Sequence, residues 1–242
     1  MFETRSHEPE RIDTGDYTED EYKTFLREIR FINRWIGDRW ALRRSLLKTI
    51  AGSDISEFSV LDVGAGSGEI LTEIALFARN TKRKAQLVGL DLNPLSADSI
   101  ATEGREFSEI RSVQGNAMQL PFDDSTFDYS ICSLFTHHFT DEGVVAILGE
   151  MKRVSRRGIF VIDLHRDRRA YFWYKVFCRV FRISELVRHD GSLSILRSFE
   201  PQELAELARR AGLSGATVTG VAPHRLVLSA TLTSGHNCQS RS

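Results

Sequence analysis

The stretch VLDVGAGSGEI, residues 60–70, decides the fold: an apolar run carries one aspartate, Asp62, and then opens into three glycines, Gly64, Gly66 and Gly68. The apolar run predicts a buried strand, and the residues after the glycines predict a helix to about residue 79. Ligands bind where a strand of a parallel sheet turns into a helix, because bare backbone lets amide groups approach them. The glycines alone would also suit a tight turn, and Asp62 could cap the helix.

The same alternation of short apolar runs and amphipathic segments continues along the chain. It predicts strands at 60–63, 87–92, 111–115, 127–134 and 158–164, with helices between them. Parallel strands need such crossovers, so the pattern predicts an α/β sheet with helices on both faces. The segments 215–221 and 224–231 are joined closely enough for a hairpin, which predicts an antiparallel edge. Two helices, with a break near Gly37, precede the first strand.

Two acidic residues indicate which ligand the glycine loop holds. A dinucleotide fingerprint, GxGxxG, would need a third glycine at position 69, where Glu69 stands instead. Asp91 ends the second strand 25 residues after Gly66, where a carboxylate can accept hydrogen bonds from both hydroxyls of a ribose. Asp62 suits a ligand with a free ammonium group. Ammonium and ribose without pyrophosphate describe S-adenosylmethionine, and a nicotinamide-dependent oxidoreductase is the rival interpretation.

The segments VLDVGAGSGEI, VGLDLNP, GNAMQLPFDDSTFDYSICSLFTHHF and LGEMKRVSRRGIFVIDL together resemble the ordered motifs of class I S-adenosylmethionine-dependent methyltransferases. The resemblance covers residues 58–165. It implies a Rossmann-like sheet of seven strands, mostly parallel, with the last strand antiparallel. It also implies S-adenosylmethionine as cofactor and S-adenosylhomocysteine as product.

The resemblance further assigns cofactor contacts to individual residues. Asp62 and the backbone of 64–68, including Ala65, would hold the methionine part, and Asp91 would hold the ribose. The adenine would lie near Asn116, where many relatives have an aspartate; the remaining predicted cofactor contacts are Leu92, Ala117 and Ser133. Asn116 can still offer its carbonyl oxygen to an exocyclic amine, without the help of a charge.

Methyl transfer to an acceptor needs mainly proximity and orientation, so a conspicuous catalytic motif is not expected. A base is needed where the acceptor is protonated. His137 and His138 follow the fourth strand and are the candidate bases, although both could be loop residues bonded to backbone. Asp163 and His165 are weaker candidates. No metal site is predicted, because the three cysteines lack metal-ligand spacing.

Residues 166–199 are predicted to form a cap over the acceptor. Residues 166–188 hold seven basic and two acidic side chains among six aromatic ones. They could receive an apolar acceptor, contact an anionic membrane peripherally, or pack on the sheet with their arginines in water. The residues predicted to contact the acceptor are Phe135, Tyr171, Trp173, Tyr174, Phe177 and His189. The run 189–192 reads as a turn.

Length and composition set the remaining expectations. The 242 residues suit a single domain over 17–232, made of N-terminal helices (17–52), a cofactor-binding core (58–165), the cap (166–199) and a C-terminal helix with hairpin (200–232). Residues 1–16 and 233–242 are expected to be flexible tails. A net charge of −1 argues against a nucleic-acid partner, and the cysteine pattern favours the cytoplasm. The oligomeric state stays open.

The sequence thus predicts a methyltransferase acting on a small apolar, aromatic or polyketide-like molecule, with oxygen as the first choice of methylated atom. A C-methyltransferase of a quinone or polyketide type is the alternative. A binding protein that keeps the cofactor without transferring a methyl group is a further rival.

Overall fold

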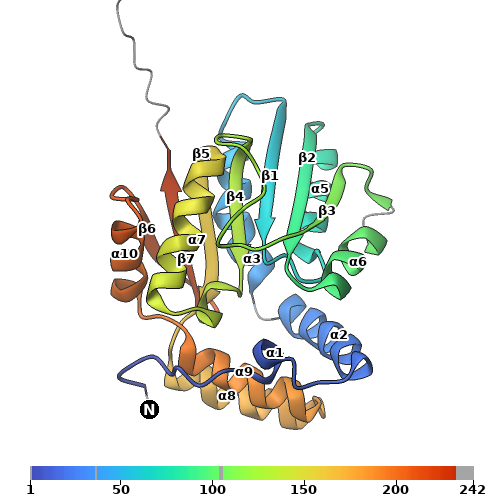
Figure 1. Ribbon diagram of the computed structural model, residues 1–242, viewed down its shortest axis with the longest axis vertical. Coiled ribbons are helices and arrows are strands. Elements are labelled where there is room, and N and C mark those ends of the chain that lie inside the picture. Colours follow the sequence, from blue (N-terminus) through green and yellow to red (C-terminus); the bar gives the residue numbers. More distant parts are fainter. Residues whose placement is uncertain (1, 36, 104–105, 233–242) are drawn as a thin grey trace, which may run out of the picture.

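The computed structural model describes residues 2–35, 37–103 and 106–232, and within them one seven-stranded sheet runs through the molecule (Figure 1). Its order is β3-β2-β1-β4-β5-β7-β6. The strands are β1 (Glu57–Val63), β2 (Lys84–Asp91), β3 (Ile110–Gln114), β4 (Phe127–Ser133), β5 (Ser155–Leu164), β6 (Thr217–Val221) and β7 (Arg225–Thr231). The first five pair in parallel, whereas β7 is antiparallel to β5 and β6. The Rossmann-like sheet predicted from the sequence is confirmed.

Helices cover both faces of the sheet. One face carries α3 (Asp38–Arg44), α4 (Leu46–Ala51), α5 (Glu69–Asn80) and α6 (Pro94–Glu103), and the other carries α7 (Asp141–Val154) and α10 (Pro201–Arg210). A buried hydrophobic cluster fills the space between sheet and helices on each side. Strand β1 is buried from Phe58 to Val63, as expected of a central parallel strand with both faces covered.

The strand order places a topological switch point between β1 and β4. The chain runs outward from β1 to β3 and then returns to β4 on the other side of β1. Loops that leave neighbouring strands at such a point diverge to opposite faces and open a crevice for a ligand. The glycine loop after β1 and the short 3-10 helix Thr136–His138 after β4 both lie at this crevice.

A further helical layer lies across the carboxyl edge of the parallel strands (Figure 1). It contains α1 (Arg11–Thr14), α2 (Glu19–Trp35), α8 (Arg168–Val180) and α9 (Glu185–Arg197). The layer has its own small core, formed by Ile32, Cys178, Ile183 and Val187. We call this layer the cap. Among the described residues, no helix combines the length and the apolar character that crossing a bilayer requires.

Two local predictions are wrong. Residues 189–192, expected as a turn, lie inside α9, where the buried Asp190 accepts hydrogen bonds from the backbone of Arg11 and Ile12. The segment 18–50, expected as two helices, holds three, because a second break follows the one at Gly37. That break is at Ser45, whose hydroxyl donates to the carbonyl of Ala41.

The prediction of a flexible tail over residues 1–16 is wrong for residues 2–16. Arg5 donates to Asp141 at 2.6 Å, and Arg197 donates to the carbonyl oxygen of Glu8 at 2.9 Å. Glu10 is only 2% exposed. These contacts are with residues far along the chain, which a local reading of the polar segment cannot reveal. Residue 1 and the predicted tail 233–242 lie outside the described residues.

Candidate active site

The glycine loop forms an open cradle between β1 and α5. The amides of Gly64 and Ala65 donate to the carbonyl of Leu90, which fixes the loop against β2. Gly64 has a positive φ of 70°, and a Cβ there would overlap the ring of Phe135. Gly66 also has a positive φ, of 56°, but nothing lies within 4 Å of where its Cβ would be. The backbone at Gly66 is therefore accessible to a ligand.

Asp62 lies below this cradle, and its buried carboxyl group lacks a partner in the part of the chain that the structure describes. It is 1% exposed, and neither carboxylate oxygen has a hydrogen-bond partner among the described residues. Burial, followed by the negative charges of Asp91 and Glu69, raises its pKa to about 8. A buried carboxylate without a partner is costly, and a cationic group would offset that cost. The ammonium group of S-adenosylmethionine fits this position.

Asp91 is turned toward the cradle. Its Oδ2 accepts from the amide of Gly66 at 2.9 Å, and its Oδ1 accepts from the amide of Asn93 at 2.9 Å. Burial raises its pKa, and the backbone hydrogen bonds oppose that shift. A carboxylate has about four lone-pair sites, so these backbone hydrogen bonds do not exhaust its capacity to accept from the hydroxyls of a ribose.

A cavity of about 280 Å³ occupies the cradle. Of the predicted cofactor residues, it is lined by Asp62, Gly64, Ala65, Gly66 and Ser133. Gly68 instead shapes the turn into α5, with a φ of 84°.

The residues predicted to contact the adenine, Leu92, Asn116 and Ala117, line neither this cavity nor its neighbour. Leu92 is 68% exposed, and the side-chain oxygen of Asn116 already accepts from the amide of Met118 at 2.9 Å. Their contacts with the cofactor therefore stay predictions.

A second, larger cavity of about 660 Å³ meets the first at Gly64 and Gly66 and lies beneath the cap. Most of its wall is apolar, and four predicted acceptor residues line it: Phe135, Trp173, Tyr174 and Phe177. Tyr171 and His189 do not. The ring of Tyr171 packs edge-on against Phe2, and half-exposed His189 pairs with Asp190. Their predicted contacts with the acceptor therefore stay predictions.

Helix α2 supplies a wall of the larger cavity that the sequence reading missed. The residues concerned are Tyr22, Phe25, Leu26, Ile29 and Ile32. Their helical spacing predicted an amphipathic helix, and the apolar face was visible in that pattern. The sequence did not reveal what this face contacts, because an apolar face has the same pattern whether it covers a core or a ligand.

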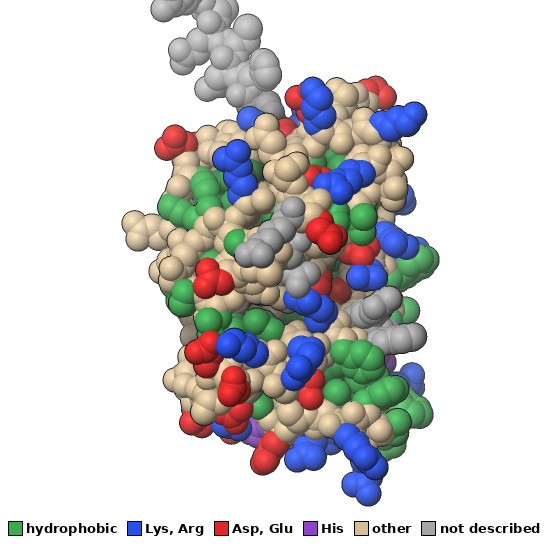
Figure 2. All heavy atoms as spheres, turned by 90° about the vertical axis from the view of Figure 1, so that its right-hand side faces the viewer, with side chains coloured by type: hydrophobic (Ala, Val, Ile, Leu, Met, Phe, Trp, Pro, Cys, Tyr) green, Lys and Arg blue, Asp and Glu red, His purple; other side chains and the backbone are tan. Residues whose placement is uncertain are grey.

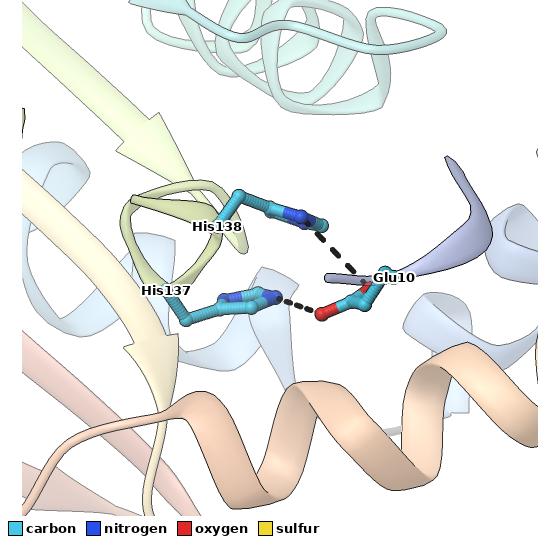
Figure 3. Close-up of side chains that lie close together, drawn as sticks. All are labelled: Glu10, His137 and His138. Atoms are coloured by element: carbon cyan, nitrogen blue, oxygen red, sulfur yellow. Dashed lines mark ion pairs between the residues drawn. The ribbon is translucent and has the colours of Figure 1, made fainter. Parts of the chain in front are cut away.

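The polar end of this cavity holds His137, His138 and Glu10 (Figure 3). His137 Nδ1 lies 2.6 Å from Oδ1 of the buried Asp163. His138 Nδ1 lies 2.7 Å from Oδ1 of Asp13. Glu10 and Asp13 were not predicted, because both belong to the segment read as a tail.

The charged groups around His137 and His138 decide which of the two can act as a base. Burial alone would lower the pKa of His138, but the charge of Glu10 and the hydrogen bond that His138 donates to Asp13 raise it to about 9. His138 is therefore protonated at neutral pH and cannot accept a proton. Burial would raise the pKa of Asp163, yet His137 and the hydrogen bond of Thr136 hold it at about 2. Of the two histidines predicted as candidate bases, only His137 remains a candidate. His165, a weaker candidate, does not line the cavity, and its Nε2 lies 3.2 Å from Oε2 of Glu200.

Residues 60–158 match the family model described as a methyltransferase domain. The fold, the cradle and the sequence relatives agree with this match. The chain belongs to the class I S-adenosylmethionine-dependent methyltransferases, and its cofactor is S-adenosylmethionine.

The relatives give the comparison more detail. The chain is 36% identical over 172 residues to the demethylmenaquinone methyltransferase of Bacillus subtilis (strain 168), covering 63% of this chain and 70% of that protein. It is 25% identical over 226 residues to the protein of the same name from Deinococcus radiodurans, covering 87% and 90%. Its fold matches a SAM-dependent methyltransferase from Aquifex aeolicus with a TM-score of 0.55 and 16% identity, over 77% of this chain and 89% of the other.

Proposed function

We propose that this methyltransferase modifies a small acceptor with a hydroxylated aromatic head and an apolar body. The observation that carries the proposal is the cavity of about 660 Å³, apolar along its walls and polar at the end where His137 lies. Apolar walls with a few convergent polar groups are typical of small-molecule sites. The cavity meets the cofactor cradle at Gly64, so an acceptor in it would lie beside the cofactor.

The chain's own residues perform the binding and the orientation. S-adenosylmethionine supplies an activated methyl group when it is bound. Asp62 and Asp91 hold the amino-acid and ribose parts, while the cap excludes water from the acceptor. Holding the reacting atoms in line can contribute roughly 7 to 11 kcal/mol of the barrier.

Oxygen is the first choice of methylated atom, because a phenolic hydroxyl at the polar end of the cavity would lose its proton there. A ring carbon of the same acceptor is the second candidate. The relatives named demethylmenaquinone methyltransferase favour it. A hydroquinone-like head offers both atoms, so the two candidates share one acceptor class.

We also propose that the protein works in the cytoplasm with the outer face of its cap against an anionic membrane surface. Figure 2 shows hydrophobic side chains gathered low on one face, with Lys and Arg side chains beside them. Exposed apolar residues of α8 and its end include Phe172, Trp173, Val176, Val180 and Phe181, and all of these except Phe172 also line the acceptor cavity. Arg179 and Arg182 are exposed beside them. Arg166 is not part of this face, because it is buried and paired with Glu203 at 2.8 Å.

The acceptor proposal is tested by incubating the protein with methyl-labelled S-adenosylmethionine and a panel of possible acceptors. The panel contains alkylated hydroquinones, alkylated phenols and unsubstituted phenols. We expect label to enter the alkylated compounds in preference to the unsubstituted ones. The carbon-13 shift of the transferred methyl group distinguishes an O-methyl from a C-methyl product. Transfer to polar amines alone would contradict the proposal.

A further inference from the structure

Glu10, His137 and His138 form a cluster with the composition of a metal site. One potential ligand atom from each lies within 4.8 Å of the other two. His137 Nε2 is 3.9 Å from Oε1 of Glu10, and His138 Nδ1 is 3.9 Å from Oε2 of the same carboxylate. The histidines come from the loop after β4 and Glu10 from the N-terminal segment, so only the fold brings them together (Figure 3).

The imidazole of His137 is oriented in the way that metal-binding histidines usually are. In such a histidine, the N–H group of the second ring nitrogen generally donates a hydrogen bond to a carboxylate. This contact fixes the ring and makes the histidine a better ligand. Here Asp163 Oδ1 lies 2.6 Å from Nδ1 of His137. In His138 the nitrogen that faces Glu10, Nδ1, itself lies 2.7 Å from Asp13. The Nε2 atom of His137 is left facing Glu10.

Glu10 has a buried carboxylate oxygen that accepts no hydrogen bond from the described residues. The side chain is 2% exposed, and its Oε1 has no hydrogen-bond partner among the described residues, whereas Oε2 accepts from Ser194 at 3.0 Å. Arg197 Nε lies 3.8 Å from Oε1, but it donates instead to the carbonyl of His137. A buried carboxylate oxygen without a hydrogen-bond donor can accept a further cationic partner.

We propose that Glu10, His137 and His138 bind one divalent transition-metal ion at the polar end of the acceptor cavity. Two imidazoles and one carboxylate suit zinc or iron(II) and leave coordination positions open. Ligand atoms of a tetrahedral zinc ion lie about 3 to 4 Å apart, so the 3.9 Å between His137 Nε2 and Glu10 Oε1 needs only a small closure. Nδ1 of His138, 3.9 Å from Oε2 of Glu10, would exchange its proton and its hydrogen bond to Asp13 for the ion.

The site would serve the proposed function, on which this second step rests. All three residues line the acceptor cavity, so an open coordination position can take a hydroxyl oxygen of the acceptor. A bound dication lowers the pKa of such a hydroxyl, which is the task for which a histidine base was predicted. His137 is then a metal ligand, and no separate base is required.

The binding step is tested on the full chain, stripped with a chelator and titrated calorimetrically with Zn²⁺ alone. We expect one ion per chain, no comparable binding of Mg²⁺, and affinity lowered at least about 10-fold in Glu10→Gln and His137→Gln. His165→Gln is the matched control, since it removes a histidine that pairs with Glu200 outside the cavity. With Co²⁺, the wild-type chain should show paramagnetically shifted signals from two imidazoles, a readout that needs no variant.

Zinc binding that is equally tight in Glu10→Gln and His137→Gln, or Co²⁺ shifts without two imidazoles, would overturn the metal site. Titration with S-adenosylhomocysteine in the presence of chelator tests the methyltransferase assignment separately, because Asp62 and Asp91 do not belong to the cluster. The acceptor step is tested by the methyl-transfer assay on chelated protein. Full activity without metal would remove the catalytic role while leaving the binding result intact.

Discussion

His137 and Asp163 form a buried pair at the carboxyl ends of β4 and β5, with Nδ1 and Oδ1 2.6 Å apart. The loop after β4 provides the histidine and the end of β5 provides the aspartate. Asp163 also accepts from the hydroxyl of Thr136 and from the backbone of Leu164. These contacts hold the ring of His137 in one orientation, with Nε2 toward the acceptor cavity.

The first prediction concerns the contribution of this pair to stability. Asp163→Asn should lower the free energy of unfolding by about 1 to 3 kcal/mol at neutral pH, since it removes the charge-assisted hydrogen bond to His137. The folded-state pKa of Asp163 is depressed to about 2, so its stabilisation is complete above the unfolded value of about 4 and is lost as pH falls toward 2. Urea unfolding of chelated protein between about pH 7 and pH 3 checks this.

The exposed pair of Glu206 and Arg209 provides the control for that experiment. Glu206→Gln should change stability by less than about 1 kcal/mol, because exposed ion pairs contribute little. The interpretation fails if wild type and Asp163→Asn lose stability in parallel as the solution is acidified.

The second prediction separates stability from cofactor binding at Asp62. Asp62→Asn should weaken S-adenosylhomocysteine binding by roughly 10- to 100-fold, because the ammonium group loses its counter-charge. The cofactor-free variant should unfold at a higher temperature than wild type at about pH 8, since it no longer buries an unpaired carboxylate. Calorimetry and thermal unfolding measure the two effects. Asp128→Asn, at the opposite end of the sheet, should leave cofactor affinity unchanged.

The third prediction is a pH dependence of cofactor binding. The pKa of Asp62 is raised to about 8 without cofactor, so the carboxyl is protonated below that value and must ionise to pair with an ammonium group. Affinity for S-adenosylhomocysteine should therefore rise between about pH 6 and pH 7.5, with release of up to about one proton. Titrations in buffers of different ionisation enthalpy count that proton. A proton count that is the same in Asp62→Asn would assign it to another group.

The fourth prediction uses two neighbouring aromatic residues of α8. Trp173 is 62% exposed and lines the acceptor cavity, whereas Phe172 is 60% exposed and does not. Trp173→Ala should weaken acceptor binding about 10-fold and leave cofactor affinity unchanged, because burying an aromatic surface contributes about 1 to 3 kcal/mol. Phe172→Ala, similar in exposure, should have little effect in the same assay. Equal effects of both variants would show that the acceptor does not contact Trp173 in this cavity.

The fifth prediction concerns the outer face of the cap. Vesicles with anionic lipid should bind the protein, and the charge reversals Arg179→Glu and Arg182→Glu together should abolish most of that binding. Each basic residue near such a surface contributes about 1 kcal/mol. Arg209→Glu on α10 is the matched control. Binding that is insensitive to salt, or equal in all variants, would exclude an electrostatic contact through α8.

Much of the fold and of the cofactor site could be predicted from the sequence, because both depend on local pattern. The spacing of apolar runs indicated the alternation of strands and helices, and a glycine loop followed 25 residues later by Asp91 indicated a ribose. Sequence alone could not separate Tyr171 from Tyr174. Only their positions on α8 relative to the cavity decide that Tyr174 lines it and Tyr171 does not.

The sequence by itself determined the sheet, its antiparallel edge and the carboxylate below the glycine loop, since a strand, a helix or a tight turn is specified by residues close together in the chain. The tertiary structure alone decided that residues 2–16 pack against α9 and bring Glu10 next to His137. These two residues are 127 positions apart, and their contact depends on hydrogen bonds such as that from Arg197 to the backbone of Glu8. Polar contacts of this kind leave no periodic trace in the sequence, because they require only that one donor and one acceptor meet in space.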